Sequence, residues 1–449
     1  MNFLVILISI LLSVICVLLA LLQHYYFITK FYKKPSSKYA PEFEDLIPSD
    51  RKNLYELGYP IQNLNQDEDS VLNYLTSALK SQPKKISENI NIISQNPKKM
   101  GIDTEVYNVL QAALAFKSAG KNNKAMKLFE HASAIAPDNA DVLNWYGEFL
   151  EQQHHDIVTA DELYFKALTH CPNHEAALSN RERTAPVVDR LDYLLFKTID
   201  NKKDYLKDRM KLDNFDSVKK QAYYLHIYHT VGIEGNTMTV EQLRYVLETG
   251  HVVSGKSIME HNEILGLEKA MQYVKLLIRT DYIGVTEILG IHRRVMGHVD
   301  PIKSGVFRDE KVFIGSHIPP PHEEIPALME NYAEWLNSEE AHSMHPVRYA
   351  AIAHYKLVDI HPFVDGNGRT SRLIMNLILL KAGYPPVMIL KEQREQYYQA
   401  LKTANMGDVR PFVRFVAHCT LQILDMYIYG TRFLSIDGSS EAENHVIHY

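Results

Sequence analysis

The chain has 449 residues, enough for two or three domains, and its 46% hydrophobic content is ordinary for a protein that buries a core. Its 48 basic and 54 acidic residues give a net charge of −6, so it offers no polycationic surface for phosphate backbones, which argues against nucleic acid as a partner. Its three widely separated cysteines form no Cys-x-x-Cys pair, which argues against a disulfide framework and a cysteine zinc site.

Residues 1–23 are predicted to form a membrane anchor. The run from Phe3 to Leu22 carries no charge and, as a helix, is long enough to cross a bilayer core of about 30 Å. A cleaved signal peptide is the alternative, but the apolar region of such a peptide is usually only about 7 to 15 residues long. Lys30, Lys33 and Lys34 follow the run, and this basic flank by itself favours a cytoplasmic C-terminal side.

Residues 24–103 are polar and predict a spacer, after which residues 104–172 contain a repeat with a period of about 34 to 35. Small residues that allow two helices to cross closely recur with aromatic residues and a final proline, the pattern of two tetratricopeptide motifs. The first copy is Ala113, Phe116, Ala125, Phe129, Ala132 and Pro137, and the second is Gly147, Leu150, Ala160, Tyr164, Ala167 and Pro172. The pair is either a groove for a protein partner or a rigid spacer.

The remaining sequence also predicts helices. Residues 173–215 form a linker in which an amphipathic helix is expected from Thr184 to Leu212. Residues 216–433 are mostly helical in pattern, apart from Gly305 to Pro321, which predicts a short β-hairpin and an extended turn. The tail, residues 434–449, is predicted to be disordered, and the fold class is all-α.

The segment from His361 to Arg372 combines several groups that phosphate chemistry requires. A buried helix is expected from Pro346 to Ile360, and a second helix is expected to begin directly after the loop Gly366 to Gly368 and to stop at Gly383. The glycines of Gly366-Asn367-Gly368 free backbone N–H groups where the second helix begins, which predicts a cradle for phosphate oxygens.

His361 can take up a proton near neutral pH, Asp365 can bind Mg²⁺, and Arg369 and Arg372 add positive charge for phosphate. No Walker or dinucleotide-binding spacing accompanies the glycines. Alone, such a histidine is usually structural and Gly-Asn-Gly is usually a turn. Because all these groups occur within twelve residues, the segment predicts a site for phosphoryl-group chemistry.

The sequence His361-Pro-Phe-x-Asp-Gly-Asn-Gly-Arg-x-x-Arg372 resembles the complete signature of the Fic-domain family. The resemblance implies that a Ser, Thr or Tyr hydroxyl of a target protein attacks the α-phosphorus of ATP and that pyrophosphate leaves. It implies His361 as general base and Asp365 as the ligand of Mg²⁺, for which Mn²⁺ could substitute. It further implies that the nucleotide lies against Asp365, Gly366, Asn367, Gly368, Arg369, Thr370, Ser371 and Arg372, with Arg372 on the γ-phosphate.

Two other regions match the family less specifically. The hairpin with Ile314, Gly315, Ser316 and His317 resembles the family's flap, which aligns the target chain by strand pairing. Tyr397, Tyr398 and Asn405 stand where the family places nucleoside contacts, although packing is an equally common role for such residues.

The segment Thr230 to Asn236 resembles the family's inhibitory motif, which implies that Glu234 pairs with Arg372 and displaces the γ-phosphate. A charge-assisted pair contributes on the order of 1.5 to 3 kcal/mol, enough for a switch. The alternative is a simple helix end, at which Gly235 terminates the helix and Glu234 is solvated. Glu234 could also position water to hydrolyse the AMP–protein bond, so that one site would both add and remove AMP.

Anchor, repeats, inhibitory motif and signature together resemble the membrane-anchored metazoan members of this family. That resemblance implies a single-pass type II protein of the endoplasmic-reticulum membrane with a lumenal catalytic domain, in conflict with the basic flank. It implies the heat-shock chaperone BiP as target and a homodimer with Ile258 in the contact helix. The alternative function is a membrane-tethered chaperone-binding scaffold with a residual catalytic domain.

Overall fold

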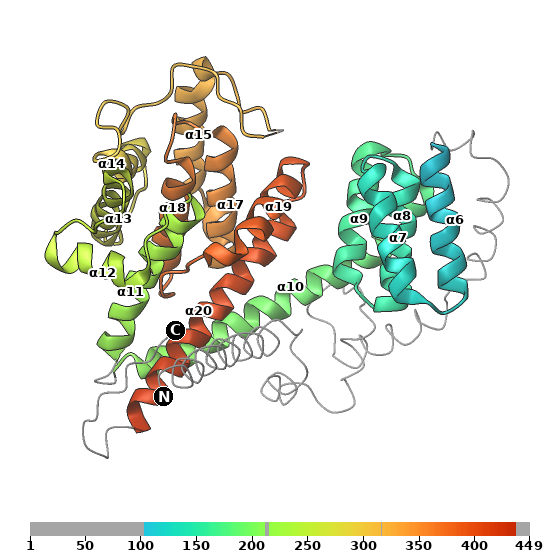
Figure 1. Ribbon diagram of the computed structural model, residues 1–449, viewed down its shortest axis with the longest axis horizontal. Helices are drawn as coiled ribbons and strands as arrows, with labels where there is room; N and C mark the ends of the chain where they lie inside the picture. The colour runs from blue at the N-terminus through green and yellow to red at the C-terminus, as the bar shows by residue number, and fades with distance from the viewer. Residues whose placement is uncertain (1–102, 212–214, 316, 437–449) are drawn as a thin grey trace, which may run out of the picture. The chain divides into compact units, whose positions relative to one another are not determined.

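The computed structural model describes residues 103–211, 215–315 and 317–436, and their regular secondary structure is helical apart from one isolated β-bridge (Figure 1). The predicted anchor, the predicted spacer except for its last residue, and most of the predicted tail therefore lie outside the described residues. Within the described ranges, none of the helices has the length and apolar character needed to span a bilayer. The all-α prediction is confirmed for this part of the chain.

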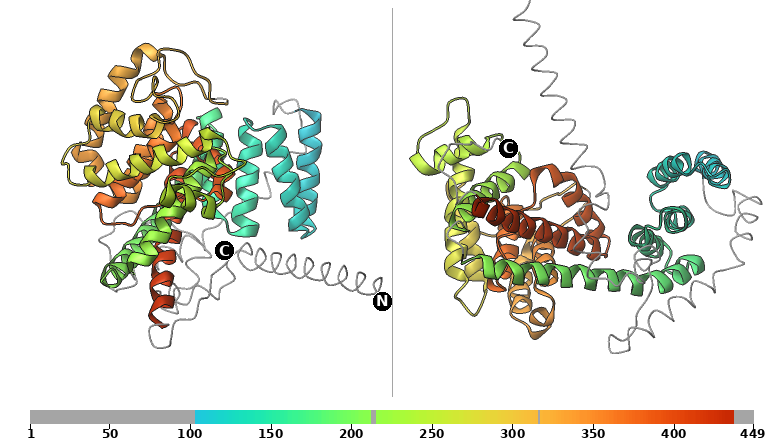
Figure 2. Two further views of the ribbon diagram at one scale, coloured as in Figure 1. Left: turned by 60° about the vertical axis from the view of Figure 1, so that its left-hand side comes forward. Right: turned by 90° about the horizontal axis from the view of Figure 1, so that it is seen from below.

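Four antiparallel helices form the repeat region: α6 (Thr104–Ser118), α7 (Asn122–Ile135), α8 (Ala140–Phe149, followed by a π-helical turn) and α9 (Ile157–His170). They pack in sequence as two helix pairs (Figure 2). The small residues of the predicted pattern are buried at the crossings. A Cβ added to Gly147 would lie 2.6 Å from Tyr164 Cε1, so the second pair closes only because residue 147 has no side chain.

The long helix α10 (Glu175–Arg209) begins nine residues before the predicted start and continues through Pro186. The His174 side chain accepts a hydrogen bond from the Ala177 N–H and caps the helix start, which the apolar pattern alone did not indicate. The helix packs against α9 near its beginning and against α20 (Arg410–Ile436) later.

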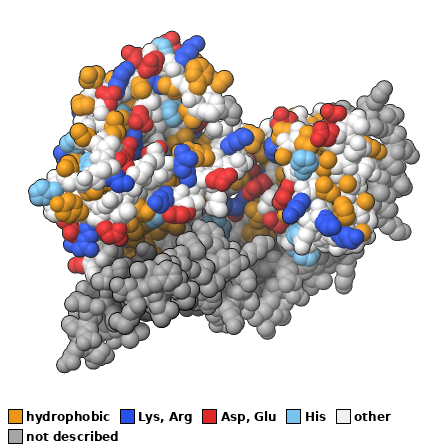
Figure 3. All heavy atoms as spheres, viewed as in Figure 1, with side chains coloured by type: hydrophobic (Ala, Val, Ile, Leu, Met, Phe, Trp, Pro, Cys, Tyr) orange, Lys and Arg blue, Asp and Glu red, His pale blue; other side chains and the backbone are white. Residues whose placement is uncertain are grey.

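The remaining helices surround one hydrophobic core. They are α11 (Phe215–Ile233), α12 (Val240–Thr249), α13 (Ile258–Leu277), α14 (Val285–Met296), α15 (Ile325–Leu336), α16 (Glu339–Ser343), α17 (Pro346–Ile360), α18 (Asn367–Lys381) and α19 (Arg394–Asn405). Helix α18 lies at the centre, buried on nearly all sides and packed against α13, α14 and α17. On the face shown in Figure 3, acidic and basic side chains are interspersed rather than segregated.

The predicted β-hairpin is wrong in its extent. Between Arg308 and Pro320, a segment here called the flap, the described residues form only one antiparallel bridge, Ile314 with His317. The turn is tight, with Gly315 at φ +59°, and the prolines after Ile318 have no N–H to continue a ladder. The flap therefore has unpaired backbone on both sides of the bridge.

Candidate functional site

His361 ends helix α17 in a left-handed conformation, with φ +49° and ψ +59°, which is costly for a residue with a side chain. Its N–H donates to the Leu357 carbonyl, and its Nδ1 lies 3.3 Å from the Val358 carbonyl oxygen. Because a carbonyl only accepts, Nδ1 carries the proton and Nε2 has a free lone pair. Burial lowers the pKa of His361 to about 4, so the ring is neutral at physiological pH and can accept a proton.

The loop after His361 is shaped by Gly366 and by the first residue of α18. Gly366 has φ +78°, and a Cβ there would lie 2.9 Å from Met296 Sδ. The Asn367 side chain accepts from the Phe363 N–H and donates to the Phe363 carbonyl, which fixes the turn. The helix thus begins at Asn367, earlier than predicted, and its first N–H groups have no intrahelical acceptor. This is a helix N-terminus suited to phosphate oxygens.

Arg372 lies buried on the first turns of α18. Its Nη2 donates to Glu234 Oε1 at 2.5 Å and to the Thr230 carbonyl at 3.2 Å, and its guanidinium lies 5.9 Å from the centre of the Tyr397 ring. Its Nε and Nη1 are buried and have no hydrogen-bond acceptor among the described residues. A buried guanidinium that satisfies only part of its donors can also bind an anion.

Glu234 follows the last residue of α11, and its side chain is 27% exposed. The N–H groups of Glu234 and Asn236 both donate to the Val231 carbonyl, and Gly235 adopts φ +104°, so the helix ends here as the simpler interpretation required. The Asn236 amide donates to Glu263 and to the Glu260 carbonyl. Glu234 is nevertheless paired as well as partly exposed, because its fixed backbone directs the carboxylate to Arg372.

Asp365 lies on the other side of the loop, 63% exposed. Its Oδ2 accepts from Arg369 Nη2 at 3.0 Å, and its Oδ1 accepts from the Gly366 N–H at 2.6 Å. The described residues contain no group of three or more His, Cys, Asp or Glu side chains that could hold a metal ion, and the carboxylate that this loop itself provides is that of Asp365. That donor set fits Mg²⁺, which is commonly held by one or two carboxylates together with phosphate oxygens and water.

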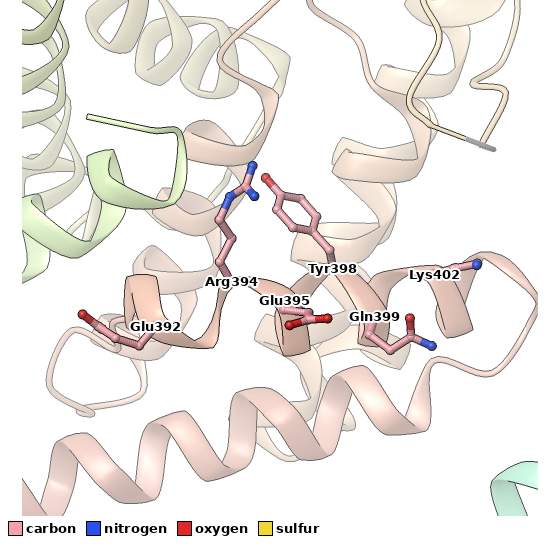
Figure 4. A pocket seen from close by; sticks show the side chains of 6 residues that line it. All are labelled: Glu392, Arg394, Glu395, Tyr398, Gln399 and Lys402. Atoms are coloured by element: carbon pink, nitrogen blue, oxygen red, sulfur yellow. The ribbon is translucent and has the colours of Figure 1, made fainter. Parts of the chain in front are cut away.

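The residues predicted to contact the nucleoside occupy different surroundings. Tyr397 is buried beneath Arg372 and its hydroxyl lies 3.2 Å from His354 Nε2, which favours a packing and positioning role. Tyr398 is exposed, and the Arg394 guanidinium lies 5.0 Å from its ring (Figure 4). Tyr398 and Arg394 line an open pocket of about 570 Å³, and its other lining residues are Glu392, Glu395, Gln399 and Lys402. Asn405, the last residue of α19, is exposed and does not line it.

The other predicted contact residues are divided between core and flap. Thr370 and Ser371 are fully buried, and the Ser371 hydroxyl lies between the Gly368 carbonyl and His354, so its side chain faces the core. Ile314 and His317 form the flap's bridge. Ser316 lies outside the described residues.

Sequence reasoning missed two residues that hold the loop. His292, on α14, stacks on Phe363 with ring centroids 3.6 Å apart, accepts from the Gly305 N–H, and donates to the Asp365 carbonyl. Arg308 donates to backbone carbonyls on both sides of the site. Neither residue belongs to the segment from His361 to Arg372, and hydrogen bonds to backbone acceptors leave no pattern in a single sequence.

Comparison with known proteins agrees with this geometry. The Fic/DOC family matches residues 282–379, which include the flap, α17 and most of α18. The chain is 52% identical over 336 residues to the protein adenylyltransferase Fic of Culex quinquefasciatus, covering 74% of this chain and 67% of the relative. It is 54% identical over 329 residues to the protein of the same name in Drosophila melanogaster, and the match covers 73% of this chain and 67% of that relative.

A solved structure of Fic-1 from C. elegans is 38% identical and superposes with a TM-score of 0.67, covering 73% of this chain and 99% of that one. A second structure of Fic-1 gives 39% identity and a TM-score of 0.66, covering 72% and 99%. These similarities extend well beyond the segment from His361 to Arg372. The chain therefore belongs to the Fic/DOC family and is a protein adenylyltransferase, an enzyme that transfers AMP to proteins.

Proposed function

We propose that the AMP donor is ATP and that His361 is the general base of the transfer. The hydroxyl oxygen of the target forms a bond to the α-phosphorus, the bond from that phosphorus to the pyrophosphate oxygen breaks, and the hydroxyl proton passes to His361 Nε2. The supporting observation is the 3.3 Å contact between His361 Nδ1 and the Val358 carbonyl oxygen: because a carbonyl only accepts, this contact favours the proton on Nδ1 and leaves Nε2 free. The flap, with unpaired backbone beside the Ile314–His317 bridge, would bind the target chain as an added strand.

The phosphates are assigned to the N-terminus of α18, with Arg372 as the cation for the γ-phosphate. Two buried donors of Arg372 without acceptors support this assignment, as does Gly368, where a Cβ would lie 3.1 Å from Arg372 Nη1 and fill the space. Asp365 would hold Mg²⁺, which when bound neutralises charge on the phosphate oxygens.

The same site is proposed to be autoinhibited by Glu234. The observation that carries this proposal is the 2.5 Å contact between Glu234 Oε1 and Arg372 Nη2, made by a buried guanidinium and a carboxylate on a fixed backbone. A carboxylate there competes with the γ-phosphate for one guanidinium. Because a charge-assisted pair contributes about 1.5 to 3 kcal/mol, ATP in the productive pose is disfavoured by roughly ten- to a hundred-fold.

The first test removes the carboxylate. With ATP labelled at the α-phosphate and Mg²⁺, Glu234→Gly protein should incorporate roughly ten- to a hundred-fold more label into protein than the unmodified chain. Glu234→Gln, which keeps the shape of the side chain without its charge, should incorporate an amount of label between those of the unmodified chain and Glu234→Gly. His361→Ala in the Glu234→Gly protein should abolish labelling. Equal labelling with and without His361, or labelling from the γ-phosphate, would contradict the mechanism.

Glu234 is also proposed to serve the reverse reaction, in which it orients a water molecule toward the phosphorus of the AMP–protein bond. The water oxygen bonds to phosphorus, the bond to the target oxygen breaks, and that oxygen leaves with the water's proton. The 27% exposure of Glu234 allows water to reach it. Incubated with AMP-modified target, the unmodified chain should release AMP and Glu234→Gly should not. Release at an unchanged rate by Glu234→Gly would exclude this role.

The target proposed from the resemblance is the chaperone BiP, and the location is the endoplasmic-reticulum membrane with a lumenal catalytic domain. The uncharged run Phe3 to Leu22 and the folded pair of tetratricopeptide motifs support this proposal. Protease protection in sealed microsomes tests the orientation, since digestion of the catalytic domain without detergent would contradict it. Purified BiP as acceptor in the labelling assay tests the target.

A homodimer is proposed through the start of α13, where Ile258 is 76% exposed and two apolar residues close to it in sequence, Met259 and Val252, are also exposed. Exposed apolar side chains gathered at one place indicate a contact surface. Ile258→Asp should convert a dimer to a monomer in analytical ultracentrifugation. A monomeric unmodified chain would refute the proposal.

A further inference from the structure

Arg308 is a buried arginine at the start of the flap. The residue is 3% exposed, although it is close in sequence to exposed flap residues such as Phe313. Among the described residues no carboxylate forms an ion pair with it, and burial is the sole cause that shifts its pKa, whereas a buried charge normally requires a counter-ion. Burial accordingly lowers the pKa of its guanidinium. The burial of this unpaired charge is unfavourable for folding, so other interactions of Arg308 must offset it.

All the acceptors of Arg308 are backbone carbonyls, and they belong to two different parts of the site. Its Nη1 donates to the Glu310 carbonyl at 2.9 Å and its Nη2 to the Pro320 carbonyl at 2.7 Å, one on each end of the flap. Its Nε donates to the His361 carbonyl at 2.8 Å, and its own N–H donates to the Pro362 carbonyl at 2.9 Å. One side chain therefore joins both ends of the flap to the catalytic loop.

The flap has little other support at its base. Its single bridge, Ile314 with His317, lies at the tip, and no ladder of strand hydrogen bonds continues toward Glu310 and Pro320 in the described part. His317 adds two longer contacts to α17, with its Nε2 3.4 Å from the Asp359 carbonyl and 3.4 Å from the Asp359 carboxylate. The distance between the flap and His361 thus depends largely on the fork of the Arg308 guanidinium.

The other end of the fork acts on a strained residue. His361 has φ +49°, and such a conformation persists only where its surroundings hold it. The Leu357 carbonyl fixes its N–H, and Arg308 fixes its carbonyl. The two peptide groups that flank the Cα of His361 are therefore both hydrogen-bonded, which sets the direction of the imidazole.

We propose that Arg308 is a positioning residue that holds the target-binding flap and the base His361 at the separation that transfer requires. This role of Arg308 rests on the proposed function of the flap in binding the target. A lysine cannot replace the arginine, because one ammonium cannot reach three carbonyls in the directions of a planar fork. Displacement of a reacting group by about 1 Å can cost on the order of a hundred-fold in rate, so the effect should fall on kcat.

The experiment compares Arg308→Lys, Arg308→Met and the control Arg348→Lys, an exposed arginine on α17, all in Glu234→Gly protein with BiP as acceptor. For both Arg308 variants we expect kcat to fall at least ten-fold, the KM for BiP to rise no more than about three-fold, and the Kd for ATP to stay within two-fold. The control should match its parent. Unchanged kcat for Arg308→Lys, or loss of ATP binding in parallel with kcat, would overturn the proposal.

Hydrogen–deuterium exchange supplies a readout that needs no acceptor. The backbone amides of Ile314 and His317, which donate to each other's carbonyls, should exchange at least ten-fold faster in Arg308→Lys, while those of α17 and α18 should be unchanged. Faster exchange throughout the catalytic helices would indicate a general structural role and refute the proposal, as would an unchanged flap. If Glu234→Gly itself transfers no AMP to BiP, the proposed function or target fails, and the exchange measurement still decides the role of Arg308.

Discussion

At the scale of single residues, the burial of His361 predicts how the reaction depends on pH. Burial holds its pKa at about 4, and only the hydrogen bond to the Val358 carbonyl and the charge of Asp365 act in the opposite direction. For the free enzyme, the acid side of the profile of kcat/KM reports this group. We expect kcat/KM of Glu234→Gly protein to stay nearly constant from pH 7.5 to about 5.5 and to fall only toward about 4.

An ordinary histidine, with a pKa of about 6.5, would already have lost about nine-tenths of its neutral form at pH 5.5. A profile whose acid side is centred near 6.5 would therefore refute this prediction. Circular dichroism at each pH must accompany the rates, because partial unfolding would also lower them. Arg308→Lys provides a further comparison, since moving that cation away from His361 should raise the pKa slightly.

The residues of the site differ in how far their sequence reveals them. His361, Asp365 and Arg372 could be predicted because their groups are close in sequence and each has a distinct chemical role. Glu234 lies 138 residues from Arg372, and only the family resemblance joined them. Arg308 could not be predicted, since its partners are carbonyls, which every residue carries. The packing of Tyr397 beneath Arg372 likewise depends on tertiary contacts.

At the scale of secondary-structure elements, the crossing of α8 and α9 depends on Gly147. An added Cβ would lie 2.6 Å from Tyr164 Cε1, and the ring is fully buried, so it cannot move aside freely. Overpacking of this kind costs about 1 to 3 kcal/mol, more than the gain of about 1 kcal/mol from replacing glycine within a helix. Gly147→Ala should therefore loosen the repeat, seen as faster limited proteolysis within α6 to α9.

The matched control shortens the opposing side chain. Tyr164→Leu alone leaves a cavity and removes the hydroxyl that donates to Glu151, so it is destabilising. The double variant Gly147→Ala, Tyr164→Leu, however, should lose less free energy of unfolding than the sum of the losses of the two single variants, because the added methyl no longer meets a ring. Strict additivity would show that the two residues do not oppose each other, contrary to the structure.

Elements differed from the sequence expectation where a side chain binds backbone groups, because such bonds leave no pattern in the sequence. Helix α17 has the predicted bounds, Pro346–Ile360, because a proline start and an apolar face define it locally. Helix α18 starts within the predicted loop, since the Asn367 side chain binds the backbone of Phe363. The hairpin was overestimated because the Arg308 side chain occupies the Glu310 and Pro320 carbonyls, which a longer ladder would have used.

At the scale of the whole molecule, buried neutral histidines couple the fold to pH. Burial lowers the pKa of four histidines to about 4, namely His226, His229, His292 and His361, and lowers that of His354 well below its usual value. In the unfolded chain these groups titrate near 6.5. Glu162 acts oppositely: burial raises its pKa to about 7, so in the folded state it takes up a proton at a higher pH than in the unfolded chain.

Between about pH 6.5 and 4, these histidines bind protons in the unfolded chain but not in the folded one. The contribution of the neutral, buried histidines to stability is therefore complete above about pH 6.5 and is lost as the pH falls toward 4. Burial also lowers the pKa of His345 and His418, so seven histidines oppose the raised pKa values of His174 and of three carboxyls, Glu162, Asp192 and Glu263. We therefore expect the free energy of unfolding in urea to decrease from pH 6.5 to 5. His226 is buried, and its Nδ1 has no hydrogen-bond partner in the described residues, so phenylalanine should fit there. His226→Phe should reduce the slope by up to about 1.4 kcal/mol per pH unit, one proton's worth, whereas exposed His251→Phe should leave it unchanged. A slope that is the same in both variants would show that His226 takes no part in this coupling.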